Sequence, residues 1–250
     1  MMDEIVEALR SEQDRVAAMV EPLDRNGLAT PSRCAGWTVA DVLLHLAQTN
    51  ELAVASIMGT FREAVASGPR VDDATSVDDW VDRVVDAERT DDLESIRDRW
   101  LTSAEIQATA FAQADPKARV QWVAGEMAAR TLATTRFTET WIHAGDIAAG
   151  LGVEHPPGEH LHQIVRLAHR TLPYAFASAG KELSGPVRLE LHAPSGEQWT
   201  LGDEDATTVV RGAAVDLVEV AGQRRSAAGT SLTAEGPDAQ DVLTLVRTFA

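Results

Sequence analysis

Apolar residues recur at helical spacing along about the first 180 residues of the chain. Thr38 is expected to cap one of these helices, because Asp41 stands three residues further on in a capping-box arrangement. The clearest pattern contains good helix formers throughout and stops at Gly150 and Gly152. Pro173 is expected to bend or interrupt the last helix. The expected helices cover residues 3–22, 38 to the break near 68, 78–113 as one or two helices, 125–149 and 158–177.

Beyond residue 185 the spacing of the apolar residues changes from helical to alternating. Val187, Leu189 and Leu191 alternate with polar residues, which is typical of a half-buried strand. The segment 194–196, Pro-Ser-Gly, predicts a turn into the next strand. The remaining expected elements are a strand through 199–201, a strand over 207–210, a helix over 213–220, a strand over 230–234 and a helix over 237–249.

These patterns predict two domains within an α+β fold. Gly180, Ser184 and Gly185 cluster where the spacing changes, so the boundary is placed there. A helical bundle is expected over residues 1–180 and a small α+β domain over residues 181–250. A chain of 250 residues is long enough for each domain to bury a core.

Composition narrows the class of protein. The apolar fraction of 44% and the charged fraction of 24% are those of an ordinary globular protein. The N-terminus lacks the basic start and apolar stretch of a secretory signal, and no apolar run reaches the ~20 residues that span a bilayer. Cys34 is the only cysteine, which excludes an internal disulfide and an all-cysteine metal site. A cytoplasmic location is expected.

The charge of the chain argues against two classes of partner. A net charge of −17 disfavours nucleic acid and anionic membranes, because both need clustered Lys and Arg. The acidic run over residues 71–100 is typical of a solvated helix face. We therefore expect small-molecule partners, and a chain that acts as a monomer or homodimer.

The segment over residues 136–146 carries the candidate chemistry. Glu139 and His143 lie four residues apart, so on a helix both side chains leave the same face and can bind one metal ion. Asp146 can hydrogen-bond the same imidazole or a metal-bound water. His45, in an apolar helix, is the candidate for a third ligand. The set of His and Glu favours zinc.

Each of these residues also has an ordinary interpretation. A Glu–His pair at this spacing is common on solvated helix surfaces, and a histidine in an apolar helix is often only a hydrogen-bonded core residue. Asp146 is, in this interpretation, an ordinary polar residue of the surface. His155, His160 and His162 would bind metal only accidentally, at the surface. The residues alone leave both interpretations open.

Two segments resemble a known family. The sequence over residues 35–47, Ala-Gly-Trp-Thr-Val-Ala-Asp-Val-Leu-Leu-His-Leu-Ala, and the segment over 138–148 with Leu151-Gly152 resemble the two motifs of the mycothiol-dependent maleylpyruvate isomerase family. That family belongs to the DinB-like metal-binding four-helix bundles. The segments 187–199, 211–213 and 248–250 resemble its small sterol-carrier-like C-terminal domain.

The resemblance implies a site and a chemistry. The metal ligands of the family fall on His45, Glu139 and His143, and the nucleophile implied is the thiol of mycothiol. The implied reaction is isomerisation or S-conjugation of a small electrophilic metabolite. A thiol-independent metal-dependent hydrolase, lyase or cyclase and a non-enzymatic small-molecule carrier remain alternatives. Cys34, beside an arginine, is the competing nucleophile and is interpreted as incidental.

The resemblance also implies an arginine in the C-terminal domain that faces the metal. Arg224 and Arg225 are the candidates for binding a substrate carboxylate, and a solvated charge is the ordinary interpretation of both. A cleft between the two domains, with the metal ligands at its floor, is the expected substrate site.

Overall fold

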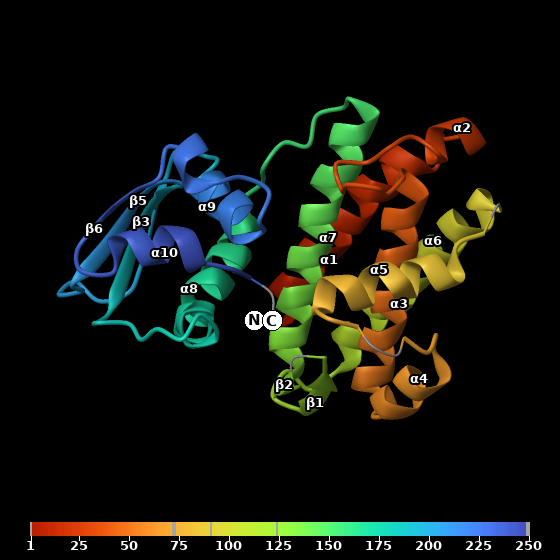
Figure 1. Cartoon of the computed structure of the whole chain (residues 1–250), viewed down its shortest axis with the longest axis horizontal. Coiled ribbons are helices and arrows are strands. Elements are labelled where there is room, and N and C mark those ends of the chain that lie inside the picture. Colours follow the sequence, from red (N-terminus) through yellow and green to blue (C-terminus); the bar gives the residue numbers. More distant parts are fainter. Residues whose placement is uncertain (1, 72–73, 91, 124, 249–250) are drawn as a thin grey trace. The chain divides into compact units, whose positions relative to one another are not determined.

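The computed structural model describes residues 2–71, 74–90, 92–123 and 125–248, and its chain divides into two units, residues 1–155 and 156–250. The first unit, red to green in Figure 1, is mainly helical. Its elements are α1 (Met2–Val20), α2 (Arg25–Leu28), α3 (Val39–Ile57), α4 (Phe61–Ser67), α5 (Val77–Glu88), α6 (Leu93–Gln113), the strands β1 (Arg119–Trp122) and β2 (Gly125–Ala128), and α7 (Ala129–Leu151).

Helix α7 lies in the interior of this bundle. It packs on α1, α3 and α6, while α3 also packs along α6 (Figure 1). Most of its residues are buried, polar ones included, as expected of a helix enclosed by neighbours. Leu43 and Leu46 of α3, Trp100 of α6 and Ile147 of α7 are among the fully buried side chains of the core. The polar residues of α7 must therefore find partners inside the protein.

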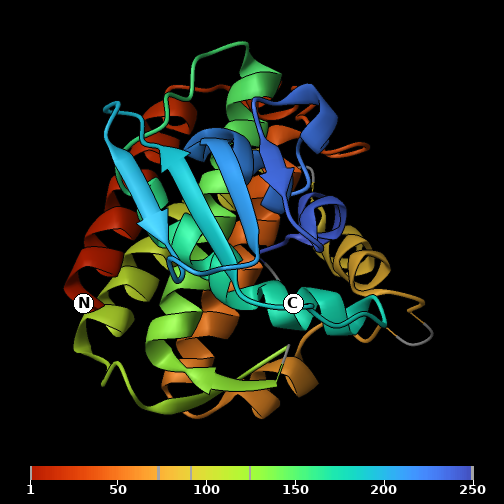
Figure 2. The same ribbon diagram turned by 90° about the vertical axis from the view of Figure 1, so that its left-hand side faces the viewer.

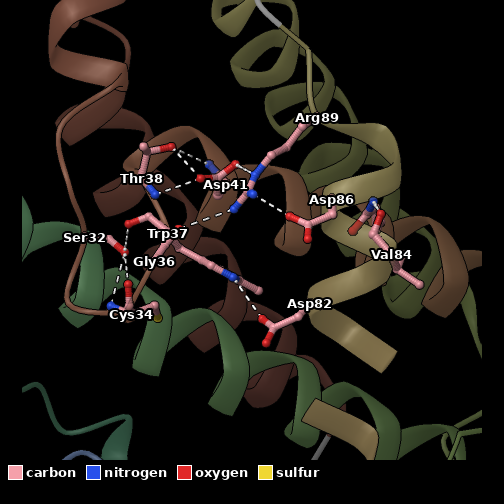
Figure 3. Close-up of polar contacts among 11 residues, drawn as sticks. Ser32, Cys34, Gly36, Trp37, Thr38, Asp41, Asp82, Val84, Asp86 and Arg89 are labelled. Atoms are coloured by element: carbon pink, nitrogen blue, oxygen red, sulfur yellow. Dashed lines mark hydrogen bonds and ion pairs between the residues drawn. The ribbon is translucent and has the colours of Figure 1, made fainter. Parts of the chain in front are cut away.

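The start of α3 carries the capping box that the sequence predicts. The Asp41 backbone N–H donates to Thr38 Oγ1 over 3.2 Å, and the Thr38 backbone N–H donates to Asp41 Oδ2 over 2.8 Å. Figure 3 shows Arg89 reaching the same carboxylate, with Nε 2.8 Å from Asp41 Oδ1. The hydrogen bond to Asp41 raises the pKa of Arg89. The cap of α3 is thereby tied to the end of α5.

The second unit is a half-buried sheet with helices packed against it. Its elements are α8 (Leu161–Ser178), β3 (Val187–His192), β4 (Gln198–Leu201), β5 (Thr208–Ala213), α9 (Ala214–Ala221), the 3-10 helix η1 (Ala227–Gly229), β6 (Thr233–Glu235) and α10 (Ala239–Leu245). Among the described residues the strands form one sheet in the order β4-β3-β5-β6, with β3 and β5 parallel (Figure 2). Burial alternates along β3 as its sequence predicts. The expected fold class, a helical bundle followed by a small α+β unit, is confirmed.

The boundary between the units falls at His155–Pro156, whereas the sequence placed it near residue 180. Helix α8 packs on α9, α10 and β4, so its apolar face belongs to the second core. Leu161, Ile164 and Leu172 are buried on that face. Helical spacing identified the element correctly but carried no information about which core it joins.

Three further expectations differ from the structure. The hairpin β1–β2 was not expected; the chain is paired from Arg119↔Ala128 to Trp122↔Gly125, so α7 begins at Ala129 rather than Gly125. Helix α8 runs continuously through Pro173. Helix α10 ends at Leu245, and residues 249–250 lie outside the described residues. In the described ranges, no helix is long and apolar enough to span a membrane.

We predict that Thr38→Ala lowers the free energy of unfolding by about 1 kcal/mol, because the mutation leaves the Asp41 backbone N–H without its acceptor. Urea denaturation followed by circular dichroism measures the change. Thr60→Ala is the matched control, since Thr60 occupies the N-cap of α4 without a side-chain cap hydrogen bond. Equal effects of the two mutations would contradict the predicted contribution of the cap.

Candidate metal centre

Glu139 and His143 occupy one face of α7, as their spacing predicts. His143 Nε2 lies 3.7 Å from Glu139 Oε2. The His143 side chain is buried and the Glu139 side chain is 20% exposed, so this face is neither fully solvated nor part of an apolar core. The interpretation as a surface Glu–His pair is therefore wrong.

His45 comes to the same place from α3. Its ring centroid lies 5.0 Å from that of His143, and the two planes are inclined by 69°. Trp37, from the loop before α3, also packs against His45, with ring centroids 5.4 Å apart. One ligand atom each from His45, Glu139 and His143 can be chosen so that all lie within 4.8 Å of one another. The structure thus brings together the three residues that the sequence predicts as metal ligands.

Asp146 orients the His143 ring. This carboxylate is 0% exposed, and its Oδ2 lies 3.0 Å from His143 Nδ1. A proton on Nδ1 shared with Asp146 leaves the Nε2 lone pair facing Glu139, which is the tautomer a metal ligand needs. The sequence-based role of Asp146 as a partner of the imidazole agrees with this geometry.

Cys34 contacts the same carboxylate from the loop before α3. Its thiol donates to Asp146 Oδ2 over 3.2 Å, and Sγ lies 3.9 Å from His143 Nδ1. The Arg33 backbone N–H also donates to the carbonyl of Asp146 over 3.1 Å. Cys34, His143 and Asp146 form a second group of potential ligands that shares the His143 ring. Cys34 is therefore part of the site's hydrogen bonding, which the sequence analysis missed.

Gly150 allows this loop to approach α7. A Cβ at Gly150 would lie 2.5 Å from the Pro31 carbonyl oxygen and 2.9 Å from Ser32 Cα. No real side chain tolerates such distances, so the loop that carries Cys34 rests directly on the helix backbone.

Arg136 is the second residue that the sequence analysis missed. It lies three residues before Glu139 and seven before His143, and this spacing on a helix places the three on one face. Its side chain is buried, with the residue 2% exposed, and desolvation lowers the pKa of Arg136 to about 10. The helical spacing of Arg136 from Glu139 and His143, in the same segment, was the signal that could have identified this residue.

The candidate arginines of the second unit differ in their partners. Arg225 NH1 lies 2.7 Å from Asp216 Oδ1 and 2.8 Å from Glu219 Oε2, and Glu219 raises the pKa of Arg225 most. Arg224 NH1 donates to the Gly222 carbonyl over 3.0 Å. Arg224 follows Gln223, which adopts a left-handed backbone with φ +61°. That either arginine faces the metal ligands stays a prediction.

The other histidines lie elsewhere. His155 is hydrogen-bonded to the buried carboxylate of Glu12 and contacts Trp141, so it is a core residue of the first unit. His162 contacts Trp199 in the second unit. Neither of the two ligand groups found among the described residues includes His155, His160 or His162.

The fold and the donor set define a class of protein: a helical bundle with a His–Glu–His candidate metal centre, followed by a small α+β unit. The chain belongs to the mycothiol maleylpyruvate isomerase family, because the model of that family's N-terminal domain matches residues 9–148. The matched range contains all three candidate ligands and confirms the family resemblance of the two motifs.

Individual relatives cover nearly the whole chain. Two uncharacterized proteins of Mycobacterium tuberculosis, from strains CDC 1551 / Oshkosh and ATCC 25618 / H37Rv, are each 32% identical over 250 residues, covering 97% of this chain and 93% of the relative. Crystal structures of the mycothiol-dependent maleylpyruvate isomerase and of a histidine-to-alanine mutant match with a TM-score of 0.62 at 20% identity, covering 96% of both chains. At this identity the solved structures show a shared fold.

We predict that Asp146→Asn weakens zinc binding about 10- to 100-fold, because the amide no longer fixes the His143 tautomer as a carboxylate does. Competition with a chromophoric chelator measures the affinity. Asp238→Asn is the control, since Asp238 is also buried and hydrogen-bonded but lies in the second unit. Unchanged affinity in Asp146→Asn would remove Asp146 from the metal centre.

Proposed function

We propose that the chain is a metal-dependent enzyme that uses mycothiol to isomerise or S-conjugate a small electrophilic metabolite. The observation that carries this proposal is the convergence of His45, Glu139 and His143, with Asp146 on the far nitrogen of His143. Membership of the mycothiol maleylpyruvate isomerase family supports the thiol and the isomerase class.

The residues present fit a divalent metal. Two imidazole nitrogens and one carboxylate oxygen form the donor set of catalytic zinc sites, which leave a coordination position for a substrate. Asp146 supplies the partner that ligating histidines ordinarily have. Zinc bound by these residues would lower the pKa of a coordinated thiol.

The position of Cys34 favours a thiol from a cosubstrate. Its Sγ lies on the Nδ1 side of His143, hydrogen-bonded to Asp146, whereas Glu139 lies on the Nε2 side. In this geometry the protein's own thiol is on the opposite edge of the imidazole from the proposed metal position. The nucleophile is therefore assigned to mycothiol, and Cys34 to the support of Asp146.

Arg224 and Arg225 are the candidates for binding a substrate carboxylate in the second unit. Arg225 already binds two carboxylates, and Ser231 also donates to Asp216, so this arginine serves the local structure. A non-glycine residue in the left-handed region, here Gln223, costs conformational energy and is enriched at functional sites. We propose that the substrate-binding arginine is one of the pair Arg224 and Arg225, which follow this residue.

We predict that protein purified without added metal or a polyhistidine tag contains close to one divalent ion per chain. Replacing His45, Glu139 or His143 singly by alanine should remove most of it, because two remaining ligands bind zinc weakly. Elemental analysis measures the content, and circular dichroism checks the fold. His162→Ala, in the second unit, should retain the metal; full retention in all three ligand variants would overturn the site.

We further predict that mycothiol adds a sulfur-to-metal charge-transfer band to the spectrum of the cobalt-substituted protein. Cys34→Ala should show the same band, since the sulfur comes from the cosubstrate. A band that is present without mycothiol and lost in Cys34→Ala would identify Cys34 as the ligand instead. Equal turnover of a substrate with and without thiol would favour a hydrolase, lyase or cyclase that uses water.

A further inference from the structure

Arg136 is a buried cation with too few partners. Among the residues that the structure describes, its side chain makes one hydrogen bond, from Nη2 to Thr49 Oγ1 over 2.8 Å, and its Nε is buried without a partner. Trp122 lies under the guanidinium at 5.9 Å, a cation–π contact that compensates only part of the lost hydration. Buried charges in proteins are ordinarily paired and fully hydrogen-bonded.

The position of Arg136 adds a second cost. Its electrostatic partner is Glu139, which is also a candidate metal ligand. A positive charge this close repels a divalent cation and competes with it for the Glu139 carboxylate. The contacts of Arg136 with Thr49 and Trp122 compensate its burial only in part, and its charge opposes metal binding, so its presence needs another explanation.

The geometry of α3 and α7 places Arg136 next to the metal centre. His45 of α3 lies beside His143 of α7. Thr49, one turn along α3 from His45, accepts a hydrogen bond from Arg136, which lies seven residues or about two turns before His143 on α7. Thr49 is fixed by its own hydrogen bond to the His45 carbonyl over 2.8 Å. Glu139 lies between Arg136 and His143 along α7, so the arginine shares one face of this helix with two of the candidate ligands.

We propose that Arg136 is an anion-binding residue at the floor of the metal centre and that it binds a carboxylate group of the substrate. This inference rests on the proposed function for the role of the metal, but the anion site itself needs only Arg136. A guanidinium can give a carboxylate two parallel N–H bonds. A metal held by Glu139 would neutralise that side chain and leave Arg136 to the incoming carboxylate.

A carboxylate fits this position better than a phosphate. One negative charge matches the single charge of Arg136, whereas a doubly charged phosphate would leave a second negative charge unpaired at this buried position. The planar carboxylate also needs only two donors, and Arg136 retains several N–H groups beyond the one that binds Thr49.

The test is calorimetric titration of the full-length protein with maleate, in zinc-loaded and zinc-free samples whose metal content is measured. Arg136→Gln should weaken maleate binding about 10- to 100-fold, the effect of removing a charged hydrogen-bonding partner. Arg136→Lys keeps the charge but loses the planar fork, so its affinity should be intermediate. Zinc content should be equal or higher in Arg136→Gln, because a repelling charge is removed.

Arg130→Gln is the matched control, since Arg130 is exposed on the same helix and its loss changes the net charge equally. It should bind maleate as the wild type does. Maleamide is uncharged, so it should bind Arg136→Gln and the wild type with equal affinity. Maleate affinity that is unchanged in Arg136→Gln and Arg136→Lys, with or without zinc, would overturn the proposal.

The same titrations separate this inference from the proposed function. A wild type that contains no metal, yet binds maleate through Arg136, would refute the metal-dependent enzyme and keep the anion site. Maleate binding that needs zinc but is independent of Arg136 would refute the anion site and keep the metal centre. If Arg136→Gln does not fold, Arg136→Lys and the wild type still decide the outcome.

Discussion

The enclosure of α7 on three sides is the constraint on which the rest of the site depends. The buried polar side chains of this helix are out of water, so they need partners inside the protein. The Asp146 carboxylate is hydrogen-bonded to His143 and Cys34, and the Arg33 backbone N–H donates to the Asp146 carbonyl. One buried carboxylate therefore orients a candidate ligand and joins the loop before α3 to the helix.

The parts of the site that lie on one helix could be predicted from the sequence, because periodicity places residues on a face. Glu139, His143 and Asp146 are of this kind. His45 was identified by its polarity in an apolar helix and by the family motif. The contact of Cys34 with Asp146 spans 112 positions and has no local pattern, so no spacing rule could reveal it. The same limit explains why α8 was identified as a helix but assigned to the wrong core.

Family membership and chemical assignment rest on different parts of the molecule. The family match over residues 9–148 ends within α7 and includes each candidate ligand, while the full-length relatives extend through the second unit. A shared fold supports many reactions, whereas the donor set, the hydrogen bond between His143 and Asp146 and the buried Arg136 restrict what can happen at this site. These local features are where members of one family can diverge in substrate.

Gly150 shows how such divergence is bounded. Near the end of a long helix alanine would be preferred by roughly 1 kcal/mol, yet even one methyl group there would collide with the Pro31 backbone. The position is therefore closed to every other residue for as long as the loop rests on α7. A change at residue 150 must be accompanied by a remodelled loop, and with it a different environment for Asp146.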